Sequence, residues 1–69
     1  MTQKELLYME DAICHEQTII KVLEETINNL EDSTLVTYIE KEKDTHTKMA
    51  EKLKKLMEDI VNEWSSTIK

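Results

Sequence analysis

The sequence predicts an all-α protein, an antiparallel hairpin of two helices, two copies of which form a four-helix bundle. Three observations predict this fold. The 69 residues include no glycine and no proline, which the tight turns of β-hairpins and phosphate-binding loops need. Apolar residues recur at spacings of three and four through both halves of the chain, the period of an α-helix with one apolar side. A chain this short also gains stability by association with a second copy.

The first predicted helix covers about residues 3–30. It begins after Thr2, which forms a capping box with Glu5, because the two residues can each accept a hydrogen bond from the other's backbone. Glu16 occupies the one polar position in the apolar row of this helix. The apolar positions of the row are Leu6, Met9, Ile13, Ile20, Leu23, Ile27 and Leu30.

A turn at about residues 31–33 separates this helix from a second one, predicted at about residues 34–65. The only cluster of turn-forming polar residues lies here, and Asp32 is the residue that we expect to cap the second helix. Glu42 and His46 would fill two polar positions in the apolar row of the second helix. The apolar positions of that row are Leu35, Ile39, Met49, Leu53, Leu56 and Ile60.

A test of register supports the hairpin. If the chain folds back at the turn, the residue numbers of facing residues add to one constant. The pairs Leu6–Leu56, Ile13–Met49 and Ile27–Leu35 all satisfy the same constant. Two independent apolar rows therefore align layer by layer, as in a helical hairpin with a short loop.

Further apolar residues lie beside these two rows and predict a homodimer. Beside the second row they are Val36, Ala50, Met57 and Trp64, and beside the first they are Ala12 and Ile19. A lone hairpin would leave these residues in water, whereas a dimer of hairpins would bury them. Parallel and antiparallel association both remain open. With the turns at opposite ends, Trp64 would lie near the partner's turn.

The same register places a polar layer within the apolar rows. It pairs Glu16 with His46, and Glu42 lies one helical turn from His46. Carboxylate and imidazole groups are ligands for Fe, Mn or Zn, so Glu16, His46 and Glu42 are candidate metal ligands. The alternative is a buried hydrogen-bonded pair, with Lys43 supplying positive charge near Glu16.

Two resemblances follow from these residues. The inward Glu16 and His46 resemble the ligands of ferritin-like di-iron carboxylate proteins, although Lys43 stands where the Glu three residues before the histidine would bridge the metals. The segments Leu6–Gln17 and Leu30–Leu35, with the later His46, are similar to small ferritin-like proteins related to spore coat protein F of spore-forming Firmicutes. This second resemblance covers about residues 6–60 and implies a ferritin-like fold, a coat-associated role and no assured enzyme activity.

The distribution of charge limits the kinds of partner that we expect this chain to bind. The whole net charge of −6 falls in residues 1–32, residues 33–69 are balanced, and the chain has no arginine. We therefore expect neither nucleic-acid nor membrane binding. Cys14 is the only cysteine and no secretion signal is visible, so we expect a cytoplasmic protein, with the spore association that the resemblance implies.

The predicted function is that of a non-enzymatic structural or interaction protein that acts as a homodimer. The sequence shows no constellation of nucleophile, base and oxyanion donors. Two alternatives stay open. One is a minimal metal-binding or redox protein that uses Glu16, Glu42 and His46, and the other is an acidic coiled-coil adaptor for a basic partner.

Overall fold

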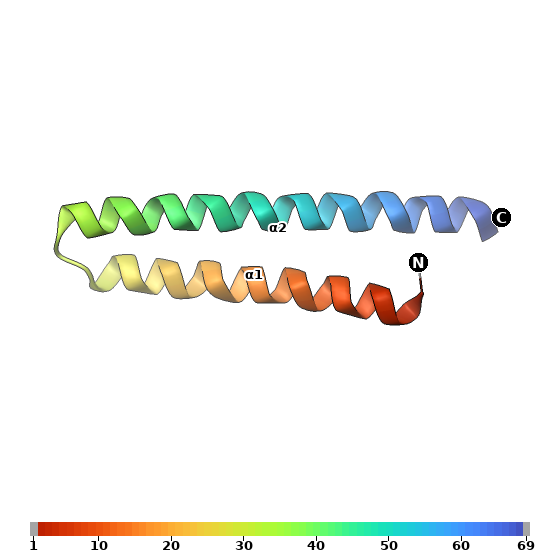
Figure 1. The fold of residues 1–69 in the computed structure, drawn as a ribbon, viewed down its shortest axis with the longest axis horizontal. Coiled ribbons are helices and arrows are strands. Elements are labelled where there is room, and N and C mark those ends of the chain that lie inside the picture. The colour runs from red at the N-terminus through yellow and green to blue at the C-terminus, as the bar shows by residue number, and fades with distance from the viewer. Residues whose placement is uncertain (1, 69) are drawn as a thin grey trace.

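The structure is a computed structural model that describes residues 2–68, with side chains described as far as Trp64. It contains two α-helices, α1 at Gln3–Asn29 and α2 at Ser33–Ile68, which lie side by side and run in opposite directions (Figure 1). The prediction of an all-α helical hairpin is confirmed. The linker is residues 30–32 rather than 31–33, and α2 continues beyond the predicted end near residue 65.

The start of α1 is fixed by the predicted capping box. The backbone N–H of Thr2 donates to the Glu5 carboxylate at 2.9 Å, and the backbone N–H of Glu5 donates to the Thr2 hydroxyl at 3.1 Å. These two bonds satisfy amide groups that have no partner inside the helix. The Thr2 hydrogen bonds also lower the pKa of the Glu5 carboxyl, because they favour its ionised form.

The start of α2 is fixed by Asp32, as predicted. Its Oδ1 atom accepts hydrogen bonds from the backbone N–H groups of Thr34 at 2.8 Å and Leu35 at 3.1 Å. The chain reaches this cap through Leu30, whose backbone is extended. Over the described residues the backbone has no positive φ angle, so no residue of the linker has a conformation that favours glycine.

The packing of α2 corrects part of the predicted apolar row. Ala50 is 5% exposed and is the most buried of the described side chains of α2, whereas Leu35, Met49 and Leu56 are between 43% and 51% exposed. The prediction that these three residues face α1 is therefore wrong. The neighbouring row packs against α1 instead, and it consists of Val36, Ala50 and Met57 together with Ile39, Leu53 and Ile60.

The prediction that the hairpin alone leaves Val36, Ala50 and Met57 in water is wrong for the same reason. These three residues lie one position further along the sequence than Leu35, Met49 and Leu56. One residue corresponds to about 100° of rotation around a helix. The face of α2 turned toward α1 is therefore rotated from the predicted one, and a different set of apolar residues is left outside.

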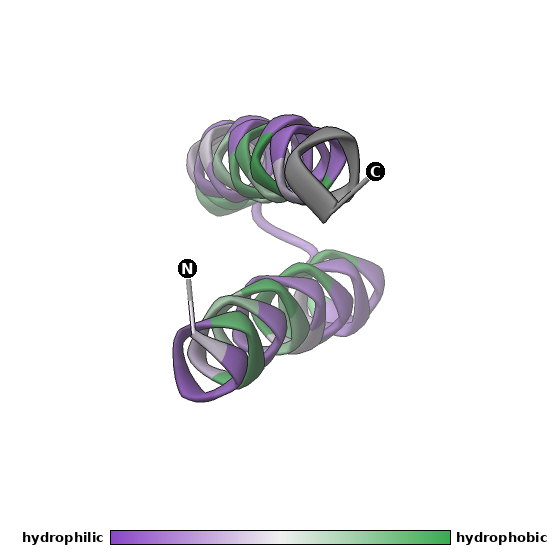
Figure 2. Ribbon diagram, turned by 90° about the vertical axis from the view of Figure 1, so that its right-hand side faces the viewer, coloured by the Kyte–Doolittle hydropathy of each residue, from purple (hydrophilic) through white to green (hydrophobic). Residues whose placement is uncertain are grey.

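The hairpin is long and thin, and it buries little. Its extents are 55 × 16 × 12 Å and its radius of gyration is 16.1 Å, against about 11 Å for a compact domain of this length. Viewed along its length, it is only two helices joined by the linker (Figure 2). Ile13 and Ala50 are the only buried apolar residues in the described part of the chain, and both keep a small exposed fraction. Neither helix, over the residues described, has an apolar stretch long enough to cross a membrane.

Candidate functional site

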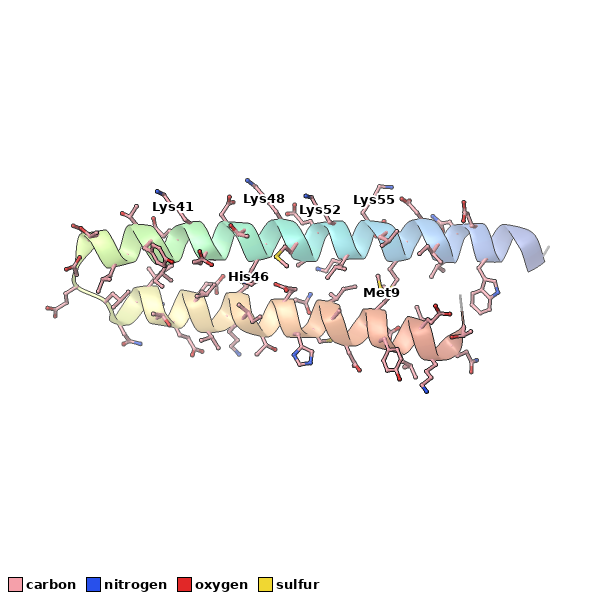
Figure 3. The ribbon with its side chains drawn as sticks, viewed as in Figure 1. Met9, Lys41, His46, Lys48, Lys52 and Lys55 are labelled. Atoms are coloured by element: carbon pink, nitrogen blue, oxygen red, sulfur yellow. The ribbon has the colours of Figure 1, made fainter. Side chains whose placement is uncertain are left out.

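Glu16 of α1 and His46 of α2 meet between the two helices, as the register predicts. The Nδ1 atom of His46 and the Oε2 atom of Glu16 are 2.5 Å apart. The Glu16 side chain is 13% exposed and the His46 side chain is 24% exposed. His46 points from α2 toward α1 (Figure 3). The sequence therefore located both members of this pair and their contact.

The pair satisfies its own polar groups. In the described residues, every buried side-chain nitrogen and oxygen atom has a hydrogen-bond partner. A carboxylate or an imidazole that is partly removed from water costs free energy if it has no hydrogen-bond partner. Here each group is the hydrogen-bond partner of the other. The contact is a hydrogen bond for a neutral imidazole and an ion pair for a protonated one.

The structure does not join Glu42 or Lys43 to this pair. Glu42 is half-buried, and among the described residues its side chain makes no hydrogen bond or ion pair. Lys43 lies 3.4 Å from the carboxylate of Glu24. The expectation that Lys43 places its charge near Glu16 is therefore wrong, because Lys43 pairs with Glu24, which lies about 12 Å along α1 from Glu16.

Within the described part of one chain, no third side chain of a metal-binding type joins the pair. Among the described residues, no three His, Cys, Asp or Glu side chains are grouped closely enough to hold a metal ion. Glu16 and His46 together offer one carboxylate and one imidazole, which is fewer ligands than Fe, Mn or Zn sites use. A second chain would have to supply the remaining ligands.

One side of the hairpin carries most of the exposed apolar residues. Tyr8 of α1 and Ile60 of α2 line one groove together with Glu5 and Met9, so these two residues mark the same side. At 100° per residue, Ile19 and Val22 lie within about 40° of Tyr8 around α1.

The same side of α2 is also apolar. Leu35, Tyr38, Met49, Leu56 and Trp64 lie within about 40° of Ile60 around the α2 axis. We call the whole surface the apolar face, and its members are Tyr8, Ile19, Val22, Leu35, Tyr38, Met49, Leu56 and Trp64. Leu7 is the only other large apolar side chain that is exposed in the described part of the chain.

The opposite side of the hairpin is polar. A second groove there is crossed by the Lys43–Glu24 ion pair and is lined by one apolar residue, Ile27, and otherwise by polar ones, Glu24, Asn28, Glu40, Lys43, Asp44 and Thr47. Glu24 lies about 160° from Tyr8 around α1, which confirms that the two grooves lie on different sides. The exposed large apolar residues are therefore gathered on one side of the hairpin, although His15 lies within about 40° of Tyr8 around α1 and Glu42 lies in line with Ile60 around α2.

Sequence reasoning found only part of the apolar face. It expected Ile19 and Trp64 beside the packed rows, and both are exposed. It placed Leu35, Met49 and Leu56 in the core, and it gave no role to Tyr8, Val22 or Tyr38. The signal that could have located them is the width of the apolar stripe on α2, which is more than one neighbouring helix can cover.

Comparison of the chain with family models, with curated proteins and with solved structures finds no match.

Proposed function

We propose that this chain is a non-enzymatic helical building block, half of a ferritin-like four-helix bundle that is completed when two hairpins associate through their apolar faces. The observation that carries the proposal is the gathering of eight exposed large apolar side chains on one side of the hairpin. Contiguous apolar patches of this kind mark interaction surfaces in proteins that otherwise keep such residues scattered.

The size of the apolar face fits a stable dimer. Its eight side chains are about half exposed on average. At roughly 150–250 Å² each, the three aromatic side chains alone expose about 250–420 Å² per chain, to which the five aliphatic ones add. A standard interface buries about 800 Å² per partner. The total accessible surface of 5602 Å² is also larger than the roughly 4500 Å² expected for a globular protein of this mass.

In this proposal the Glu16–His46 pair specifies how the hairpins align. A polar pair within an apolar interface stabilises the register that keeps it hydrogen-bonded, and it disfavours registers that place it against apolar side chains. The pair lies near the middle of the hairpin, between α1 and α2. A coat-associated structural role is the biological setting that we propose for such an assembly.

The proximity of Glu16 and His46 favours a second candidate function, metal binding in the dimer. Two copies would bring two carboxylates and two imidazoles to one level of the bundle, with Glu42 one turn away. Recovery of near-stoichiometric Fe, Mn or Zn with the purified protein, lost in Glu16→Ala, would support this candidate. Purified wild-type protein with only trace metal would support the structural role.

A matched pair of variants tests the structural proposal. Leu56 lies on the apolar face and is 49% exposed, whereas Leu7 lies off it and is 58% exposed. We expect light scattering to give a dimeric mass for the wild type and for Leu7→Glu, and a monomeric mass for Leu56→Glu. A monomeric wild type, or a Leu56→Glu variant as dimeric as Leu7→Glu, would contradict the proposal.

A further inference from the structure

We infer that the two hairpins associate with their turns at the same end of the bundle, so that α1 of each chain packs against α2 of the other. This inference rests on the proposed function, because it specifies the arrangement within the proposed dimer. The observations that carry it are the charges that border the apolar face and their positions along the helices.

Two symmetric arrangements bring the apolar faces together. If the two-fold axis runs along the helices, the turns lie at the same end and α1 lies over the partner's α2. If the axis runs across the helices, the turns lie at opposite ends, α1 lies over the partner's α1, and α2 lies over the partner's α2. Neighbouring helices are antiparallel in both cases, so helix direction does not distinguish the two.

The charges that border Tyr8 and Leu56 do distinguish them. Tyr8 is preceded one turn earlier by Lys4, whose ammonium lies 5.9 Å from the centre of the Tyr8 ring, and it is followed by Asp11. On α2, Leu56 is preceded by Lys52 and followed by Asp59 at the same two spacings. Residues three and four apart lie on the same side of a helix, so all four charges border the apolar face.

With the turns at the same end, the part of α1 around Tyr8 lies against the part of the partner's α2 around Leu56, and the two run in opposite directions. Measured from the Glu16–His46 level at 1.5 Å per residue, Asp11 and Lys52 lie about 8 Å and 9 Å toward the open end. Lys4 and Asp59 lie about 18 Å and 20 Å along. Asp11 therefore meets the partner's Lys52. Lys4 meets the partner's Asp59, which within its own chain also pairs with Lys55 at 2.8 Å. Symmetry repeats both attractive pairs on the other edge of the interface.

The opposite-end arrangement brings like charges together instead. Lys41 lies one turn after Tyr38 and about 8 Å from the Glu16–His46 level toward the turn. In this arrangement the partner's α2 runs in the opposite direction across the Glu16–His46 level. The partner's Lys52, which lies about 9 Å from that level, therefore comes to the same height as Lys41. Both lysines project from the side of α2 away from α1 (Figure 3), where they are free to meet another chain. Like charges at this position disfavour the arrangement.

The polar layer and the apolar residues agree with the same-end arrangement. A two-fold axis along the helices leaves the position of each residue along the bundle unchanged in the second chain. Glu16 and His46 therefore lie at the same height as the partner's His46 and Glu16. It also brings Tyr8 over the partner's Leu56 and Val22 over the partner's Tyr38, each within about 3 Å along the helices. These apolar residues then cover one another in the interface.

A distance measurement between two turns tests the arrangement directly. In a Cys14→Ser background, Glu31→Cys places one spin label in the exposed linker of each chain. Double electron–electron resonance should give a separation below about 25 Å for turns at the same end, and about 45 Å for turns at opposite ends. A component near 45 Å, alone or beside a shorter one, would overturn the inference while leaving the dimer intact. A monomer by light scattering would overturn the proposed function itself and this inference with it.

Charge reversal provides a second test. Within the described hairpin neither Asp11 nor Lys52 makes an ion pair, so both are available to a partner. We expect Asp11→Lys to raise the dimer dissociation constant about tenfold at low salt, and the double variant Asp11→Lys/Lys52→Asp to return it to within about threefold of the wild type. Glu10→Lys is the matched control, because it makes the same change on the far side of α1. Equal effects of Asp11→Lys and Glu10→Lys, or no rescue in the double variant, would overturn the inference.

Discussion

Substitution of Ile13 by alanine tests the packing of the hairpin most directly. Ile13 is 6% exposed and lies on the side of α1 that faces α2. The substitution removes three carbon atoms, which corresponds to about 2.4 kcal/mol of lost burial at about 0.8 kcal/mol per carbon. The cavity that remains brings the expected loss in the free energy of unfolding to about 2–4 kcal/mol.

Leu7→Ala is the matched control for this substitution. It also removes three carbon atoms, but Leu7 is 58% exposed and lies outside the apolar face. The expected loss is therefore about 1 kcal/mol, whether or not a second copy covers the apolar face. Alanine is the better helix former at both positions, which reduces each loss by a few tenths of a kcal/mol.

The assay is urea unfolding followed by circular dichroism at 222 nm, with all variants at one protein concentration. A folded chain of this length has a total stability of about 3–10 kcal/mol, so the loss in Ile13→Ala should lower the midpoint clearly. Equal midpoints for Ile13→Ala and Leu7→Ala would refute the packing of α1 against α2 described above.

Three further predictions concern the caps and the polar pair. Asp32→Ala should lower the free energy of unfolding by about 1 kcal/mol in the same assay, because α2 loses the acceptor for its first amides; an unchanged midpoint would contradict this role. Glu16→Ala should cost about 1–3 kcal/mol, because it leaves the His46 imidazole half-buried without its acceptor, and Glu16→Gln, which keeps an acceptor, should cost less. The Glu5 pKa is lowered from 4.5 in the folded chain, so the stability that Glu5 contributes is present above pH 4.5 and is lost as the pH falls through the lower, folded value. The difference in helicity between the wild type and Thr2→Ala should therefore shrink on acidification below pH 4.5, and a difference that grows would contradict the capping box.

Much of the hairpin could be predicted from the sequence, because local chemistry determines it. Thr2 and Asp32 are helix caps whose partners lie three residues away or less, so their roles depend on no distant packing. The Glu16–His46 contact could be predicted because the position of the turn determines which residues of the two antiparallel helices lie opposite each other.

The side of α2 that packs against α1 could not be predicted in the same way. The row with Leu35, Met49 and Leu56 and the row with Val36 and Ala50 are both apolar and lie one residue apart. Helical periodicity gives the width of such a stripe but does not say which edge meets the neighbouring helix. Ala50 is buried and small, and the size of a side chain affects how two helices pack in a way that the spacing of apolar residues does not record.

The single turn near the middle of the chain has a consequence for the order in which the hairpin forms. The entropy lost on closing a loop grows with the length of chain enclosed. Contacts beside the linker enclose only a few residues, whereas Glu16 and His46 are 30 residues apart in sequence, and contacts at the open end enclose more still. Each layer formed shortens the loop left for the next, so folding proceeds from the linker outward and opening proceeds from the termini inward. Amide hydrogen exchange should accordingly be slowest in the layers nearest the linker and fastest at the open end.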